Sequence, residues 1–202
     1  MNTLRDKWNK EFSSGKWDFL RRNSEQKRLQ LVAQMIERQL NETDGGCVVD
    51  LGSGEGHLCN WLDGERVRQY VAVDISDVAL NNIVEANIPV TRICESLAKY
   101  SLDENLQAAP LVIVANEVLY YEPDSVDQLK RIAEGQKHGC VVLVSVVGPH
   151  PDKPNWTASS IRLWKEIDQL GWHKLEAQVV KDEESGVAWD IVAFEIASKE
   201  KC

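Results

Sequence analysis

The hydrophobic positions along this chain fall into short continuous runs, separated by stretches with the spacing of helices. A strand covered on both faces of a sheet is apolar throughout, so we expect five strands at residues 47–51, 70–74, 90–94, 111–115 and 140–147. The intervening segments with helical spacing are residues 57–62, 77–85 and 125–134. This alternation predicts an α/β fold, Rossmann-like, with a doubly wound and mostly parallel sheet.

The two ends of the chain extend the pattern. Apolar residues recur at helical spacing from Leu29 to Leu40, and we expect residues 1–40 to form a cover followed by a helix. Near the other end we expect one helix and then two strands joined by a tight turn, at residues 159–170, 175–180 and 187–196. The whole pattern predicts one domain over residues 1–202, with seven strands and a C-terminal antiparallel hairpin.

Prolines mark one more segment. Three of the six prolines fall within residues 148–156, directly after the fifth predicted strand. Proline is excluded from helix interiors and from the middle of sheets, so this segment is expected to be a stiff loop. It would lie at the carboxyl edge of the sheet, where open α/β folds bind ligands.

Composition and charge narrow the class of protein. The chain is 43% hydrophobic and 27% charged, as in an ordinary folded domain, and has neither a membrane-length apolar run nor a signal-peptide core. Five cysteines without a CxxC pair predict reduced thiols in a cytoplasmic protein, with no metal site. A net charge of −9 argues against a nucleic-acid partner and leaves the oligomeric state open.

The most informative segment is a glycine loop that follows the first predicted strand and reads Asp-Leu-Gly-Ser-Gly-Glu-Gly at residues 50–56. Such turns also occur without a ligand, but the spacing here differs from the G-x-G-x-x-G of dinucleotide enzymes, where a helix N-terminus meets a pyrophosphate. Asp50 would repel a pyrophosphate but suits the ammonium and sulfonium groups of S-adenosylmethionine. The loop therefore favours this cofactor over a nicotinamide.

A second acid supports a nucleoside cofactor. Asp74 closes the second predicted strand, 22 residues after Gly52. A carboxylate at this place accepts hydrogen bonds from the hydroxyl groups of a ribose, and the neighbouring Ile75 is suited to cover an adenine.

These segments resemble known motifs. Residues 50–56 resemble motif I of the class I S-adenosylmethionine-dependent methyltransferases, residues 71–74 the acidic-loop motif, and residues 111–121 motif IV. The ending Glu-Val-Leu-Tyr-Tyr, with residues 17–19, 25–26 and 56–58, is similar to the NodS-like (nodulation-factor) N-methyltransferases, which methylate an amino-sugar nitrogen. The similarity covers roughly residues 15–147. Asn23 and Ser24 depart from it where an aromatic residue is expected, and the C-terminal third matches poorly.

Residues and resemblance together indicate a set of cofactor ligands. The resemblance implies a role for Glu95 with the adenine amino group, and Trp17 is placed to cover the cleft. Arg28 is suited to pair with the cofactor carboxylate, and Arg21 and Arg22 are the alternatives. The residues expected to bind S-adenosylmethionine are Trp17, Arg28, Asp50, Gly52, Gly54, Gly56, Asp74, Ile75, Glu95, Ser96 and Asn116.

The acceptor side needs a different kind of residue. An amine attacks through its lone pair and must lose a proton, so a base within reach accelerates the reaction. The candidates are Glu117, Tyr120, Tyr121 and Glu122 after the fourth strand, and His150 in the proline loop. The two tyrosines are equally suited to form a wall. An Asn/Asp-Pro-Pro-Tyr box, typical of enzymes that methylate adenine or glutamine, does not occur here.

The preferred interpretation is a methyltransferase that acts on a small-molecule amine or amino sugar. The alternatives are a small-molecule O-methyltransferase, a non-catalytic scaffold that binds S-adenosylmethionine, and a nicotinamide oxidoreductase, which the glycine spacing disfavours. In each enzymatic case we expect residues 1–28 and 148–156 to cover the cleft.

Overall fold

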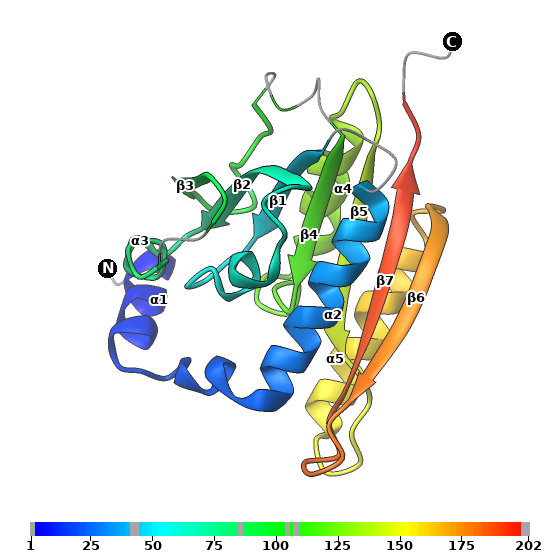
Figure 1. The fold of residues 1–202 in the computed structure, drawn as a ribbon. Helices are drawn as coiled ribbons and strands as arrows, with labels where there is room; N and C mark the ends of the chain where they lie inside the picture. Colours follow the sequence, from blue (N-terminus) through cyan, green and yellow to red (C-terminus); the bar gives the residue numbers. More distant parts are fainter. Residues whose placement is uncertain (1–2, 41–44, 85–86, 104–105, 107–109, 199–202) are drawn as a thin grey trace.

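The structure, a computed structural model, describes residues 3–40, 45–84, 87–103, 106 and 110–198. In this part of the chain, seven strands form one sheet in the order β3-β2-β1-β4-β5-β7-β6 (Figure 1). The first five strands pair in parallel, whereas β7 is antiparallel to both β5 and β6. The predicted α/β fold with a C-terminal antiparallel hairpin is confirmed.

All seven predicted strands are present. They are β1 (Gly46–Leu51), β2 (Val67–Asp74), β3 (Val90–Cys94), β4 (Leu111–Asn116), β5 (Cys140–Val147), β6 (His173–Lys181) and β7 (Ala188–Ile196). The helices are α1 (Leu4–Ser13), α2 (Asn23–Leu40), α3 (Asp77–Asn81), α4 (Ser125–Glu134) and α5 (Pro154–Asp168), with 3-10 turns η1 (Asp18–Arg21) and η2 (His57–Trp61).

Two of the predicted helices are shorter than expected. The pattern at 57–62 forms only the 3-10 turn η2, and the pattern at 77–85 forms α3, which ends at Asn81; residue 85 lies outside the described residues. Asn81 and Asn82 are poor helix formers, and Asn82 is the C-cap of α3. Ile83 packs instead beneath the glycine loop, where a Cβ on Gly56 would lie 3.0 Å from its side chain.

Helices cover both faces of the sheet. Alternate residues of β1 show the division: Val48 packs in the cluster formed with α2, η2 and α3, whereas Val49 packs in the cluster formed with α4 and α5. Figure 1 shows α2 crossing one face and α4 and α5 lying behind the other. Within the described ranges, no helix combines the length and the apolarity needed to cross a membrane.

The helix α1 was not predicted. Thr3 caps it, with the Asp6 backbone N–H donating to the Thr3 hydroxyl and the Thr3 N–H donating to the Asp6 carboxylate, so the Thr-x-x-Asp pattern was the available signal. None of its residues is buried. Figure 1 shows α1 beside α3, with the chain then running along the carboxyl edge of the sheet toward α2.

The prediction that residues 148–156 contain no helix was wrong at its end. Helix α5 begins at Pro154, which lies in the first turn. Proline is tolerated there because the first turn of a helix has no partner for the missing N–H and because the ring already has a helical φ.

Candidate active site

A cavity of about 1210 Å³ opens at the carboxyl edge of the parallel strands. Its walls come from the glycine loop, the ends of β2 and β4 and the N-terminal segment. Trp156 and Ser159 of α5 and the turn between β6 and β7 complete the lining. Its volume exceeds the roughly 300–1,000 Å³ usual for a site that holds one small ligand. The cavity is therefore large enough for a cofactor and an acceptor together.

The glycine loop forms one wall through its unusual backbone. Gly52, Gly54 and Gly56 all have left-handed φ angles, of 69°, 54° and 67°. A Cβ on Gly52 would lie 2.2 Å from the Cγ2 atom of Val118, so any side chain there would collide with the segment that follows β4. Gly52 and Gly54 line the cavity, whereas Gly56 lies behind its wall and begins η2.

Two buried oxygen atoms on this wall, one of Asp50 and one of Ser53, have no hydrogen-bond partner among the described residues. Asp50 is buried, and the Tyr70 hydroxyl donates a hydrogen bond to its Oδ2. The Oδ1 atom of Asp50 and the hydroxyl of Ser53 are also buried, without a hydrogen-bond partner in the described part of the chain. Burial raises the pKa of Asp50 to about 7. A buried carboxylate oxygen without a partner at a cavity wall is suited to bind a cationic group.

The end of β2 supplies the second acid. Asp74 accepts hydrogen bonds from the backbone N–H groups of Gly54, at 2.9 Å, and Ser76, at 2.8 Å. It lines the cavity with Ile75 and Ser96. Glu95 lies outside the wall, where its Oε1 accepts from the Ser96 N–H at 2.9 Å.

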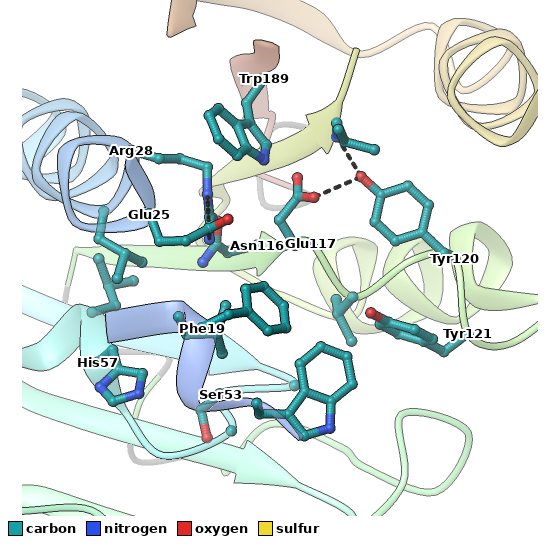
Figure 2. Close-up of a pocket in the computed structure, with 18 of the residues that line it drawn as sticks. Phe19, Glu25, Arg28, Ser53, His57, Asn116, Glu117, Tyr120, Tyr121 and Trp189 are labelled. Carbon is teal, nitrogen blue, oxygen red and sulfur yellow. Dashed lines mark hydrogen bonds and ion pairs between the residues drawn. The ribbon is translucent and has the colours of Figure 1, made fainter. Parts of the chain in front are cut away.

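Arg28 lies fully buried between α2, β4 and β7. Its Nε and Nη2 donate to one carboxylate oxygen of Glu25, at 3.2 and 2.8 Å, and its Nη1 donates to the side-chain oxygen of Asn116. The guanidinium also lies over the ring of Trp189, 5.7 Å from its centroid (Figure 2). These contacts hold the charge at the cavity wall in a fixed position.

Glu117 faces Arg28 from the end of β4. It is the one non-glycine residue with a positive φ, 59°, in the described part of the chain, a conformation that persists only where the surroundings enforce it. Its carboxylate accepts hydrogen bonds from the hydroxyls of Tyr120, at 3.0 Å, and Ser145, at 3.2 Å, and lies between Tyr120 and Trp189 in Figure 2. Burial raises the pKa of Glu117 to about 7.

The other acceptor-side candidates lie in different places. The Tyr120 hydroxyl donates to Glu117 and accepts from the Val147 N–H, and burial raises its pKa, so it remains protonated. Tyr121 lines the cavity with an exposed edge. His150 lies outside the wall, and its Nδ1 accepts from the Asp152 N–H at 3.2 Å. The structure therefore brings Glu117 and both tyrosines together but not His150.

Aromatic residues of the N-terminal segment line the cavity. The ring of Trp17 lies 5.7 Å from Trp8, 6.0 Å from Phe12 and 5.6 Å from Phe19, and all four rings line the cavity. Trp8 also contacts Tyr121 edge-on at 4.8 Å. From the proline segment only Trp156 joins the wall.

Several lining residues were missed from the sequence. Trp8 and Phe12 are spaced by four residues, which places them on one face of a helix once α1 is recognised. Trp189 and the β6–β7 turn carry no such local signal, because they reach the cavity only through the pairing of the C-terminal hairpin with β5. The turn contributes Asp182, Glu184 and Ser185.

A seven-stranded sheet of this order, with a glycine loop after β1 and an acid after β2, defines a class I methyltransferase fold. The sequence agrees: a family model described as a methyltransferase domain matches residues 21–178. The chain belongs to this family of S-adenosylmethionine-dependent methyltransferases. A search of curated protein sequences found no match.

Solved structures share the fold at low sequence identity. The N-methyltransferase NodS from Bradyrhizobium japonicum WM9, in complex with S-adenosylhomocysteine, has a TM-score of 0.67 and 14% identity, over 95% of this chain and 97% of that one. The magnesium protoporphyrin IX methyltransferase of Synechocystis PCC 6803 has a TM-score of 0.71 and 12% identity, over 96% and 98%. The 1,6-didemethyltoxoflavin-N1-methyltransferase of Burkholderia thailandensis has a TM-score of 0.68 and 10% identity, over 96% and 88%.

Proposed function

We propose that this protein methylates a nitrogen atom of a small amine, with Glu117 as the general base. The observation that carries the proposal is the environment of Glu117, a carboxylate held in the cavity by two hydroxyl donors with a pKa raised to about 7. A base is most effective when its pKa lies near the working pH, because it is then both largely ionised and a useful proton acceptor.

The chemistry divides between the cofactor and the chain. S-adenosylmethionine supplies the electrophilic methyl group. Glu117 takes the proton from the bound ammonium form of the acceptor and so frees the nitrogen lone pair for attack. The hydroxyls of Tyr120 and Ser145 hold the carboxylate in one orientation. The aromatic rings of Trp8, Trp17 and Trp189 exclude water and favour a cationic acceptor through their faces.

The same proposal assigns the cofactor ligands. Asp50 and Ser53 would bind the amino group of the methionine part, because the Asp50 Oδ1 atom and the Ser53 hydroxyl are buried without a partner among the described residues. Asp74 would bind the ribose, with Ile75 and Ser96 beside the adenine, and Arg28 would face the carboxylate. Two of the solved structures with this fold are described as N-methyltransferases, which agrees with an amine acceptor.

The test is transfer of labelled methyl from S-adenosylmethionine to matched panels of small amines, amino sugars and hydroxyl compounds. We expect product with amines, and we expect Glu117→Gln to lower kcat by about 10²–10⁴-fold, the usual contribution of a general base. Glu122→Gln is the matched control, since Glu122 lines the same cavity, whereas the Glu117 carboxylate accepts its hydrogen bonds from Tyr120 and Ser145. Its kcat should stay near that of the wild type.

The outcomes separate the alternatives. Methylation confined to hydroxyl compounds would replace the amine proposal with an O-methyltransferase. Tight cofactor binding without transfer to any member of the panels would favour a scaffold. Equal losses in Glu117→Gln and Glu122→Gln would remove Glu117 from its role as base.

A further inference from the structure

The helix α1 makes hydrogen bonds to the start of α3 through the side chain of Asn9. The Nδ2 of Asn9 donates to the Asp77 carboxylate at 2.8 Å, and the Oδ1 of Asn9 accepts from the Ser76 hydroxyl at 2.7 Å. Both donor and acceptor of the Asn9 carboxamide are therefore used, on two consecutive residues at the start of α3.

Those partners are adjacent to the proposed ribose ligand. The Ser76 N–H donates to the Asp74 carboxylate at 2.8 Å, and the Ser76 hydroxyl accepts from the Ala79 N–H at 3.1 Å as the cap of α3. Ser76 is fully buried. One residue thus connects Asn9 to Asp74, and a displacement of Asn9 acts directly on the loop that carries the acid.

The neighbours of Asn9 on α1 face the other parts of the cavity. Trp8 contacts Tyr121 edge-on at 4.8 Å, on the acceptor side. Phe12 lies over the glycine loop, 3.5 Å from the position that a Cβ on Gly54 would take. One turn of helix therefore carries an anchor, a cover for the glycine loop and part of the acceptor wall.

Few contacts hold this helix in place. No residue of α1 is buried, and within the described residues its other long-range hydrogen bond is a longer one, from Arg5 Nη2 to the Cys94 carbonyl at 3.4 Å. The two short bonds of Asn9 are consequently a large share of what fixes the helix, and the aromatic contacts of Trp8 and Phe12 depend on that position.

We infer that Asn9 is a positioning residue that couples α1 to the cofactor loop. Through Ser76 and Asp77 it holds α1 so that Phe12 covers the cofactor while Trp8 completes the acceptor wall. Cofactor binding and acceptor binding are then linked through one helix. The cofactor part rests on membership of the methyltransferase family, and the acceptor part rests on the proposed function.

The first test measures S-adenosylhomocysteine binding by calorimetry, which needs no acceptor. We expect Asn9→Ala to weaken binding by about tenfold, the equivalent of one lost hydrogen bond to a charged partner. Lys10→Ala is the control, because Lys10 lies on the same helix with an exposed side chain and should bind normally. Binding by Asn9→Ala within twofold of the control would overturn the inference.

A charge test distinguishes positioning from general damage. Asn9→Asp sets a carboxylate against Asp77 and should weaken binding more than Asn9→Ala, while adding Asp77→Asn should restore part of the loss. A merely structural helix would show no such rescue. All variants should have the melting temperature of the wild type, since α1 buries no side chain. A melting temperature that falls together with the affinity would show that α1 is part of the core, and it would overturn the inference.

The third measurement follows the coupling itself. Hydrogen exchange in residues 4–13 should slow when S-adenosylhomocysteine is added to the wild type and should not slow in Asn9→Ala. If both proteins gain the same protection, α1 is positioned without Asn9. Should an amine acceptor be found, its KM should rise in both Trp8→Ala and Asn9→Ala, although only Trp8 lines the acceptor wall. A failed search for acceptors would leave the calorimetry and exchange results standing.

Discussion

Two carboxylates at this site have similar pKa values and opposite surroundings. Burial raises the pKa of both Asp50 and Glu117 to about 7. Asp50 has one oxygen without a protein partner, whereas both oxygens of Glu117 accept hydrogen bonds from hydroxyls. The second arrangement already holds its carboxylate in one orientation. Under the proposed function, Asp50 would bind the positive charge of the cofactor and Glu117 would accept a proton from the acceptor.

The two ends also differ in how they are built. The cofactor end consists of turns whose residues are close in sequence, with Asp50, Gly52 and Gly54 in one loop. The acceptor end joins Glu117 to α1, α5 and the β6–β7 turn. A change to a glycine of the loop should therefore act through the backbone, whereas a change to Glu117 should act through one side chain.

The largest effect is expected from Gly52→Ala. The new Cβ would collide with Val118 at 2.2 Å in a left-handed backbone, so we expect S-adenosylhomocysteine binding to be lost and stability to fall by about 3 kcal/mol. Gly171→Ala is the control for strain alone, because Gly171 has a φ of 68° with nothing within 4 Å of the new atom. Calorimetry measures the affinity of both variants and thermal unfolding measures their stability. The difference between the two variants is the effect of the collision with Val118. Equal effects would mean that the close approach to Val118 is unimportant.

The pH dependence of catalysis should come from Glu117. With its pKa at about 7 the free enzyme loses its base below neutral pH, so kcat/KM for an amine should fall about tenfold per unit as the pH drops below 7. At higher pH, kcat/KM should fall again as the acceptor's own ammonium group loses its proton. The pH of this second fall should change when the acceptor is changed. A profile whose acid limb is retained in Glu117→Gln would assign it to another group.

Asp50→Asn should separate stability from binding. The pKa of Asp50 is higher in the folded protein than in the unfolded chain. Its ionisation therefore destabilises the fold, and this cost grows as the pH rises from the ordinary pKa of an aspartate, 3.8, to about 7. Asparagine removes this cost, so the advantage of the variant over the wild type in free energy of unfolding should be about 3 kcal/mol larger at pH 8 than at pH 5. Its affinity for S-adenosylmethionine should fall, since the positive charge loses its partner. Chemical unfolding at the two pH values checks the first effect and calorimetry the second.

The smallest effect is expected from Tyr120→Phe. Loss of the hydroxyl removes a donor that favours ionised Glu117, so the pKa of Glu117 should rise and the acid limb should move to higher pH by less than about one unit. Cofactor affinity should not change. A fall in activity without any shift of the limb would show that Tyr120 acts only as a wall.

The sequence predicts the fold more completely than the site. The bounds of β3, β5 and α4 match the expected ranges because each is a continuous apolar run or a clear helical period between breaks. Helix α1 has no buried face and so lacks the periodic signal. The start of α5 was misplaced because proline was read as a breaker rather than as a first-turn residue.

For the site, the sequence predicts the chemically active residues but not which of them line the cavity. The glycine loop and Asp74 lie in consecutive strand ends, so the spacing alone places them together. Glu117 and His150 were equal candidates on residue type, and only the packing of α5 and the hairpin separates them. Residues 1–28 as a cover, and the cofactor ligands, stay predictions that the variants above test.

The contact between α1 and α3 also constrains the order in which the chain can fold. Asn9 is 68 residues from Asp77, so during synthesis the helix emerges well before its anchor exists. Until β1 and β2 have paired, Trp8 and Phe12 have no surface on which to pack, and a nascent chain with several free aromatic rings is prone to unwanted association. Because α1 contributes nothing to the buried core, the sheet can assemble without it. Docking of this helix should accordingly be the last step, and a slow phase seen by tryptophan fluorescence but not by backbone circular dichroism would mark it.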